Sequence, residues 1–238
     1  MNPESTAYQH TLEIVDHWFV GDVQSVSHLS GGETGSTVVK VDTEFGSYVL
    51  KRLENWETER FDFIYDVLLH VQSQGVLVDV SVLTSEGKVV AETGRERYIL
   101  NTFLEGDASA DRDRNQKLLR NIGMAIGNLH SAFASYPNEG LGEKTWRERD
   151  WLSHNRDRAI AEAGLDSKLL SILTEAKSLV VDELCELLAQ LPEQLVHRDC
   201  HFLNIVTMAE DTVGFVDCDH LSICSPMLDL EYFCSDTS

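Results

Sequence analysis

The stretch HRDCHFLN, residues 197–204, is followed ten residues later by GFVDCDH, residues 214–220. Apolar runs typical of strands flank both pieces, and polar groups buried between strands cost free energy unless they are paired or used. Asp199 and Asn204 fall on a predicted loop between two strands, and Asp217 ends the next strand. Carboxylate and amide oxygens brought together at strand ends are hard ligands, which suit Mg²⁺.

The chain upstream of this stretch begins with a strand-rich half. An amphipathic helix over residues 7–19 precedes three short strands, SVSHLSGG, STVVKVDT and SYVLKRLE. Apolar positions then recur at helical spacing from residue 61 to the stop at Gly75. Two more strands, VSVLT at 80–84 and KVVAE at 88–92, are joined by SEGK, and the second is expected to continue through YILNTFL. This half therefore predicts a small β-sheet with one helix packed on it.

A helix-rich half follows the polar segment LEGDASADRDR. We expect residues 1–105 to form the first lobe and residues 106–238 to form a mainly helical second lobe. From Gln116 onward one helix face carries Leu118, Ile122, Ile126, Leu129 and Phe133. Two further helices are expected around 148–163 and 167–191, before short strands return on either side of the opening stretch. Strands first and helices second indicate an α+β fold.

The composition is that of a globular protein with an acidic surface. Among its 238 residues, 40 Asp and Glu oppose 19 Lys and Arg, which gives a formal charge of −21. This charge argues against a nucleic-acid partner. It suits a cationic substrate or a salt-rich cytoplasm, and a solvated acidic surface also needs no partner at all. No apolar run approaches the roughly 18 residues of a membrane span, and the N-terminus lacks the features of a signal peptide. We therefore expect a cytoplasmic protein that does not bind membranes.

The five cysteines form an odd set without paired spacing. Such a set fits reduced thiols better than a disulfide framework or a zinc site.

Together these motifs resemble the aminoglycoside phosphotransferase and choline kinase-like family, whose usual forms are close to HGDLHPGN and IDWDxxxxGDPxxDL. Here the second motif reads VDCDHLSICSPMLDL, and the order, spacing and apolar frame agree over residues 24–233. The resemblance implies a two-lobed protein kinase-like fold, with a small antiparallel β lobe that carries one helix and a mainly helical second lobe. It also implies ATP and Mg²⁺ as cofactors.

The resemblance assigns a role to each matching residue of the opening stretch. Asp199 would be the catalytic base or the carboxylate that orients the acceptor hydroxyl, and Asn204 and Asp217 would bind Mg²⁺. His197 is expected to hold the loop, and Asp229 is expected to brace it. Among the neighbours of these residues, Asp219 is expected to cap its turn or join the metal site, and Cys200 and His201 are expected to have no role.

The nucleotide site would be completed by the first lobe. Lys51 would contact the α- and β-phosphates and be oriented by a helix carboxylate, Glu59, with Glu57 and Asp62 as alternatives. Backbone amides of the loop 30–36 would cover the phosphates, since glycines let a backbone approach an anion; the residues concerned are Gly31, Gly32, Gly35 and Ser36. Backbone groups of the hinge from Asn101 to Phe103 would bind the purine.

The sequence also departs from the family pattern. Arg198 stands where the family usually has glycine, and the loop 30–36 has no GxGxxG. The chain ends at Ser238, nine residues after Asp229, where family members continue with helices that complete the acceptor site. We expect part of that site and some apolar surface to be uncovered. A naturally short form, a fragment and self-association that covers this surface all stay open.

These observations predict an ATP- and Mg²⁺-dependent phosphotransferase acting on a hydroxyl of a small molecule. Aminoglycosides, choline or ethanolamine, homoserine and sugars are all candidate acceptors. The alternative is a degenerate kinase-like protein that binds a nucleotide without efficient transfer. The early end of the chain favours the alternative, and the complete set of Lys51, Asp199, Asn204 and Asp217 favours the enzyme.

Overall fold

The structure is a computed structural model that describes most of the chain. The described parts are residues 3–29, 38–53, 57–108, 115–137, 139, 141–145, 147, 189–208 and 212–236, with short pieces between 168 and 187. Gly31, Gly32, Gly35 and Ser36 of the expected phosphate loop lie outside the described residues, as does the helix expected over 148–163. Most of the helix expected over 167–191 lies outside them as well.

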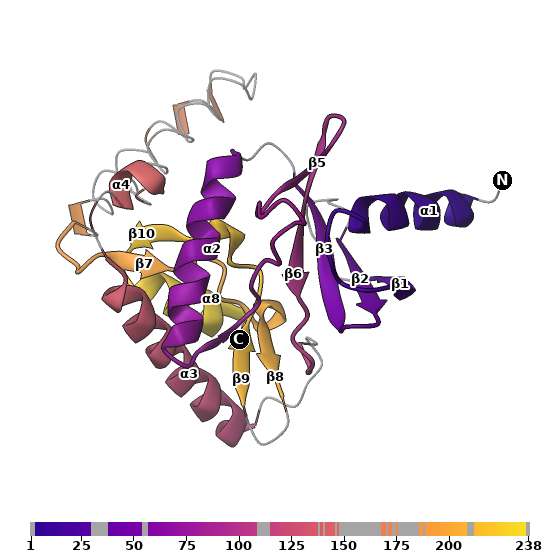
Figure 1. The fold of residues 1–238 in the computed structure, drawn as a ribbon. Coiled ribbons are helices and arrows are strands. Elements are labelled where there is room, and N and C mark those ends of the chain that lie inside the picture. Colours follow the sequence, from indigo (N-terminus) through magenta and orange to yellow (C-terminus); the bar gives the residue numbers. More distant parts are fainter. Residues whose placement is uncertain are drawn as a thin grey trace.

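An antiparallel sheet of five strands forms the N-terminal lobe (Figure 1). The order is β1-β2-β3-β6-β5, with bounds β1 (Val23–His28), β2 (Val38–Thr43), β3 (Ser47–Leu53), β5 (Ala91–Thr93) and β6 (Glu96–Thr102). The strand expected to continue from 88–92 is instead a hairpin, because Gly94 adopts a left-handed φ of 65° and turns β5 back onto β6. The three expected strands before the helix are confirmed as β1, β2 and β3.

The segment 80–84 is not a strand of this sheet, contrary to the prediction. It runs beside β6, where the Thr102 amide donates to the Val80 carbonyl at 2.9 Å. One residue earlier, the Asp79 amide donates to the Phe215 carbonyl at 3.1 Å, next to the parallel pairing of β4 (Leu77–Val78) with β9 (Val213–Phe215). The chain thus changes from one sheet to the other within a few residues, which leaves too short a run to form a ladder.

Helices cover the two faces of the N-terminal sheet. The end of α1 (Pro3–Val15) and the residues after it pack on one face, with Ile14, Val15, Trp18, Val20, Val39, Val41, Leu50 and Leu100 in a common core. The helix α2 (Thr58–Ser73) lies in a second core with Leu53 and Ile99. Successive strand residues point to opposite faces, and Lys51 is paired with Ile99 in the register of β3 and β6. Lys51 therefore lies on the face of α2.

The first helix begins and ends earlier than the predicted 7–19. Trp18 is not helical, and its indole nitrogen donates to the Val82 carbonyl at 2.8 Å. Packing against the sheet thus draws the residues after Val15 out of the helix.

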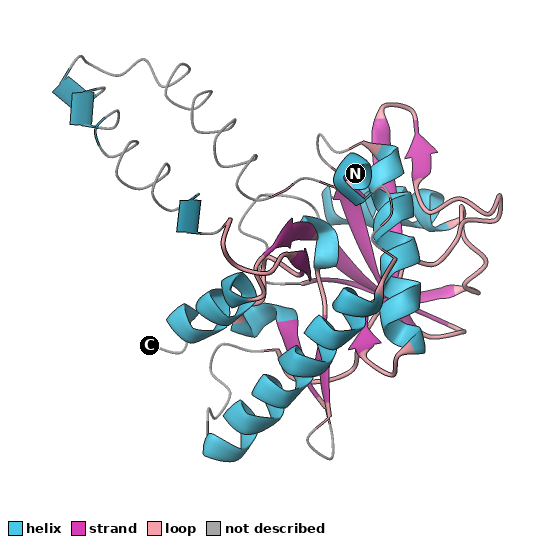
Figure 2. Cartoon of the chain, turned by 90° about the vertical axis from the view of Figure 1, so that its left-hand side faces the viewer, coloured by secondary structure: helices cyan, strands magenta, loops and turns pink. Residues whose placement is uncertain are grey.

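The second lobe places short strands beside the long helix α3 (Gln116–Ser135) (Figure 2). The apolar face of α3 is confirmed, since Ile122, Ile126, Leu129 and Phe133 are buried and Leu118 is partly buried. The expected strands around the opening stretch are β7 (Gln194–Val196), β8 (Ile205–Thr207) and β9, and β7 pairs with β10 (Ser222–Cys224). The remaining elements are α4 (Leu141–Lys144), the 3-10 turns η2 (Phe202–Asn204) and η4 (Cys218–His220), and α8 (Met227–Asp236).

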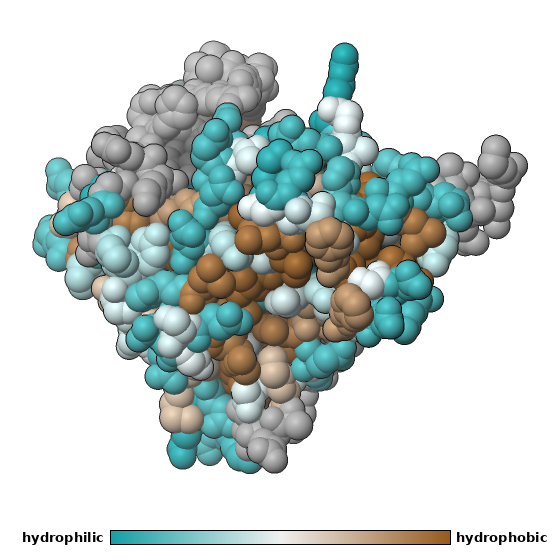
Figure 3. Space-filling model, in the orientation of Figure 1, coloured by the Kyte–Doolittle hydropathy of each residue, from teal (hydrophilic) through white to brown (hydrophobic). Residues whose placement is uncertain are grey.

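The architecture confirms the α+β fold with an antiparallel N-terminal sheet and a helical second part. Hydrophilic residues surround a central group of apolar ones on the face seen in Figure 3. Among the described helices, none combines the length and the hydropathy required to cross a membrane.

Candidate active site

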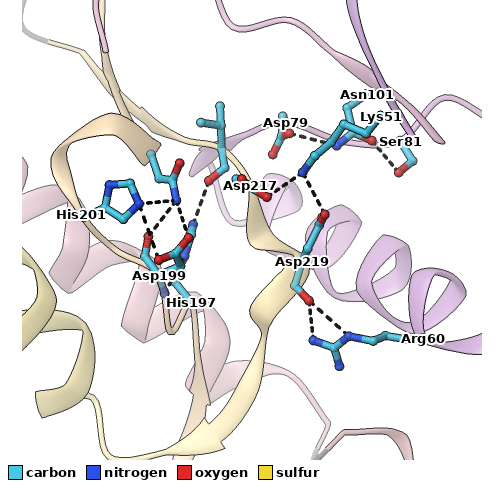
Figure 4. A network of polar contacts seen from close by, with 12 residues as sticks. Lys51, Arg60, Asp79, Ser81, Asn101, His197, Asp199, His201, Asp217 and Asp219 are labelled. Atoms are coloured by element: carbon cyan, nitrogen blue, oxygen red, sulfur yellow. Dashed lines mark hydrogen bonds and ion pairs between the residues drawn. The ribbon is translucent and has the colours of Figure 1, made fainter. Parts of the chain in front are cut away.

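A lysine from the N-terminal sheet meets two carboxylates of the second lobe. Lys51 Nζ lies 2.6 Å from Asp217 Oδ1 and 2.8 Å from Asp219 Oδ2 (Figure 4). Burial alone would lower the pKa of Lys51, but the carboxylates of Asp219 and Asp217 outweigh it and hold that pKa above its usual value. The lysine is thus a cation at any physiological pH.

Asp217 lies at the turn between β9 and η4, and its backbone has a positive φ. Its φ of 63° is left-handed, a conformation in which aspartate is one of the few residues other than glycine found regularly. Burial would raise the pKa of this carboxyl, but Lys51 outweighs that effect and lowers it. The side chain is 42% exposed, so a charged carboxylate beside Lys51 stays accessible to a ligand.

Residues 197–204, HRDCHFLN, form a compact polar loop. Asn204 Nδ2 donates to Asp199 Oδ2 at 2.8 Å and to the Asp199 carbonyl at 3.0 Å. His201, which we expected to have no role, lies with its Nε2 3.5 Å from Asp199 Oδ1. Burial would raise the pKa of Asp199, but the imidazoles of His201, His197 and His220 together outweigh it and lower the pKa. Asp199 is therefore kept ionised, as a residue that accepts a proton requires.

The fully buried Asp229 accepts hydrogen bonds from the backbone of this loop. Asp229 Oδ2 accepts the His197 amide at 3.0 Å, and Asp229 Oδ1 accepts the Arg198 amide at 2.7 Å. His130 of α3 reaches the same carboxylate at 2.9 Å. His197 Nε2 lies 3.0 Å from the Val216 carbonyl, which ties the loop to the end of β9. The structure therefore has both the bracing by Asp229 and the scaffold contact of His197 that the sequence indicated.

The backbone conformation of Arg198 is one that glycine would adopt more easily. Its φ is 66°, a left-handed conformation that glycine adopts freely. The bond from its amide to Asp229 holds the backbone in that conformation.

The expected pairing of Lys51 with Glu59 is corrected by the structure. Glu59, like Glu57 and Asp62, is exposed, whereas its neighbour Arg60 is 7% exposed and points inward. Neighbouring helix residues point about 100° apart, so only one of the two can face the core. Helix α2 therefore presents a cation to the site, where we expected an anion.

A second group of polar residues, which the sequence analysis missed, lies behind Lys51. Asn101 Nδ2 donates to Asp79 Oδ2 at 3.0 Å, and the Ser81 hydroxyl donates to Asn101 Oδ1 at 2.8 Å. Asp79 is 5% exposed, and its Oδ1 has no hydrogen-bond partner among the described residues. Burial raises the pKa of this carboxyl to about 7, although Lys51 acts in the opposite direction. An aspartate between two valines in LVDVSV was the available signal.

The hinge residues expected to bind the purine have other contacts in the structure. The Asn101 side chain is occupied by Asp79 and Ser81, as described, and the Phe103 amide donates to the Ser47 carbonyl at 3.0 Å. The Phe103 ring lies 4.4 Å from the ammonium of Lys40.

The side-chain oxygen atoms of Asn204 and Asp217 fit a hard divalent cation. The Val216 amide donates to the Asn204 carbonyl at 3.0 Å, so η2 and the end of β9 lie side by side. Because the amide nitrogen of Asn204 faces Asp199, its Oδ1 is the atom that suits a metal, together with the carboxylate of Asp217. Within the described part, no group of three or more His, Cys, Asp and Glu forms a metal site. Mg²⁺ needs no such group, since it is typically held by one or two carboxylates plus phosphates.

Comparison with known proteins also identifies similarity to phosphotransferases. The model of the phosphotransferase enzyme family, APH, matches residues 25–238. A homoserine kinase of Janthinobacterium sp. (strain Marseille) is 22% identical over 218 residues, which cover 87% of this chain and 63% of that protein. A homoserine kinase of Brucella anthropi is 25% identical over 203 residues, which cover 83% of this chain and 59% of that protein. The chain thus spans about 60% of the length of these curated relatives.

Solved structures with the same fold include several kinases of small molecules. An amicoumacin kinase in complex with AMP-PNP and Ca²⁺ superposes with a TM-score of 0.76 at 20% identity, over 100% of this chain and 72% of that one. A microcompartment-associated aminopropanol kinase gives 0.69 at 17% identity, over 95% and 72% of the two chains. A spectinomycin phosphotransferase in complex with ADP gives 0.67 at 16% identity, over 94% and 72%. At such identities the likeness shows the fold.

Proposed function

Because the chain belongs to the phosphotransferase enzyme family, we propose that it transfers the γ-phosphate of ATP to a hydroxyl of a small molecule. The observation that carries the proposal is the meeting of Lys51 and Asp217 beside the loop in which Asn204 holds Asp199. Catalysis of phosphoryl transfer depends on positioning and charge compensation by the protein more than on covalent chemistry. These four side chains supply both.

Each side chain has a separate task in this proposal. Asp199, kept ionised beside His201, orients the acceptor hydroxyl and takes its proton. Lys51 binds phosphate oxygens of the nucleotide. Asn204 Oδ1 and the Asp217 carboxylate are the atoms that would hold Mg²⁺, which when bound supplies positive charge for the phosphate oxygens.

The rest of the nucleotide site is proposed on the resemblance. The loop 30–36, with Gly31, Gly32, Gly35 and Ser36, would cover the phosphates, and the hinge from Asn101 to Phe103 would lie beside the purine. The division into a nucleotide-binding lobe of residues 1–105 and a second lobe of residues 106–238 is part of the same proposal. The reaction would take place in the cytoplasm, where ATP is available.

We propose an amino alcohol as the acceptor. Homoserine and aminopropanol, named in two of the similar kinases, each carry a hydroxyl and an amine. The formal charge of −21 favours a cation such as protonated aminopropanol over a neutral sugar, whereas homoserine, a zwitterion without net charge, is supported only by the similarity to homoserine kinases.

A two-step experiment tests the function. Thermal unfolding is first measured with and without ATP and Mg²⁺, and ADP release is then measured over amino alcohols, aminoglycosides and sugars, with Asp199→Asn as the control. The proposal predicts stabilisation by ATP with Mg²⁺ and an acceptor-dependent ADP release that the variant lacks. Stabilisation without release from any acceptor would instead support the degenerate nucleotide-binding protein. Sedimentation of the same samples would show whether copies of the chain associate.

A further inference from the structure

We infer that Asp219, and not a carboxylate of α2, is the residue that positions Lys51 for the nucleotide, and that Arg60 of α2 positions Asp219. This inference rests on the proposed function. It assigns a task to Asp219, which was expected to cap its turn or join the metal site, and to Arg60, which the sequence analysis did not single out.

The first observation is that Lys51 has two carboxylate partners of different character. Asp217 is 42% exposed and is a proposed metal ligand, so its carboxylate is required elsewhere once Mg²⁺ binds. Asp219 is 17% exposed and lies 2.8 Å from the same ammonium. If Asp217 held Mg²⁺ as proposed, Asp219 would be the carboxylate that remains with Lys51.

The second observation is that Asp219 is held from α2 through its backbone. Arg60 donates from Nε at 3.2 Å and from Nη2 at 2.5 Å to the Asp219 carbonyl, and Nη2 also reaches the Leu221 carbonyl at 3.1 Å (Figure 4). Thr145 completes this arrangement, because its hydroxyl donates to the Leu221 carbonyl at 2.8 Å. The guanidinium therefore fixes the 3-10 turn η4, which carries the Asp219 side chain toward Lys51.

The third observation is the charge of Arg60. Burial lowers the pKa of its guanidinium to about 10, which leaves it a cation at neutral pH. A cation bonded to carbonyl oxygens forms charge-assisted hydrogen bonds, which are stronger than neutral ones. Helix α2 is thus linked to Lys51 in two steps, from Arg60 to the backbone of Asp219 and from the carboxylate of Asp219 to the ammonium.

The partner of Lys51 can be identified in the protein without nucleotide. Melting temperatures are measured for Lys51→Met, for Asp219→Asn and for the double variant, and a second cycle replaces Asp219→Asn by Glu59→Gln. We expect the effects of Lys51→Met and Asp219→Asn to be non-additive by roughly 2–4 °C or more, because the residues are in contact. The cycle with Glu59→Gln should be additive. Non-additivity only in the cycle with Glu59→Gln would overturn the inference.

Binding of a fluorescent ATP analogue during a Mg²⁺ titration tests the positioning. In Asp219→Asn, Lys51 keeps only Asp217 of its two carboxylates and competes with Mg²⁺ for it, so half-saturation should need severalfold more Mg²⁺. The value of kcat/KM for the nucleotide should fall about ten- to a hundredfold, while KM for the acceptor stays unchanged. Asp219→Glu, which keeps the charge, should recover part of the loss, and Asp22→Asn, at an exposed position, should behave as the wild type.

The outcomes separate this inference from the proposed function. If the wild type binds the analogue with Mg²⁺ and Asp219→Asn needs no more Mg²⁺ than the wild type, the inference is overturned, while the proposed function is decided separately by acceptor-dependent ADP release. If the wild type does not bind the analogue at all, the proposed function is overturned. The stability cycle still decides in that case whether Asp219 is the partner of Lys51.

Discussion

The buried carboxyl of Asp79 predicts a pH dependence of stability that one substitution should remove. Asp79 is 5% exposed, accepts a bond from Asn101 through Oδ2 and leaves Oδ1 without a partner among the described residues. Burial raises its pKa from 3.8 to about 7. Asp79→Asn keeps the size of the side chain and removes its charge.

The magnitude follows from proton binding in the two states. Between pH 3.8 and about 7 the carboxyl is protonated in the folded chain and ionised in the unfolded chain. The stabilisation is therefore complete below pH 3.8 and is lost as the pH rises through about 7. At pH 5.5, which is about 1.5 units below the folded value, this group adds ~2 kcal/mol to the free energy of unfolding relative to pH 8.5.

Urea unfolding at pH 5.5 and at pH 8.5, followed by tryptophan fluorescence, measures this difference. Between the two pH values, wild type should lose ~2 kcal/mol more than Asp79→Asn. Asp22→Asn, at an exposed position, should keep the pH dependence of the wild type. The reasoning is refuted if Asp79→Asn keeps that dependence too, because the carboxyl would then not be a buried proton-binding group.

Three other substitutions test the loop of residues 197–204 and the role proposed for it. Asp199→Asn should lower acceptor-dependent ADP release about 10²–10⁴-fold without weakening ATP binding, as a proton acceptor requires; equal losses in both would point to a structural defect. Asp229→Ala should cost about 3 kcal/mol or more in urea unfolding, since it leaves the buried amide of His197, the part-buried amide of Arg198 and the ring of His130 without their acceptor; a cost below about 1 kcal/mol would contradict the bracing. Arg198→Gly should raise stability by up to about 1 kcal/mol, because relief of left-handed strain exceeds the added entropy of the unfolded chain; a loss of that size would show that the arginine side chain contributes more than the strain costs.

Several elements were predictable because their signals are local. The apolar residues of α3 recur every three or four positions, and the helix face that this pattern predicted is the buried one. The hairpin at Gly94 was mispredicted although the polar residues 92–97, ETGRER, and the left-handed Gly94 mark the turn locally. The segment 80–84 was mispredicted because VSVLT has the composition of a strand, whereas the change of sheet just before it depends on a bond from the Asp79 amide to Phe215 of another strand.

The same distinction applies to the site. The spacing of Asp199, Asn204 and Asp217 indicated one polar centre, because a short loop and the next strand must bring them close together. The partner of Lys51 could not be obtained that way, since Lys51 and Asp219 are 168 residues apart and meet only where the lobes pack.

The sequence by itself determined the family and the α+β fold, because periodicity and motif spacing can be recognised over a few residues, and it singled out Lys51, Asp199, Asn204 and Asp217 as the proposed site. Tertiary structure decided which of those residues touch. It turned Arg60 inward and Glu59 outward, placed His201 against Asp199, and buried Asp79 behind Lys51. The physical reason is that charge, burial and hydrogen bonding depend on neighbours in space, and these neighbours come from strands and helices far apart in the chain.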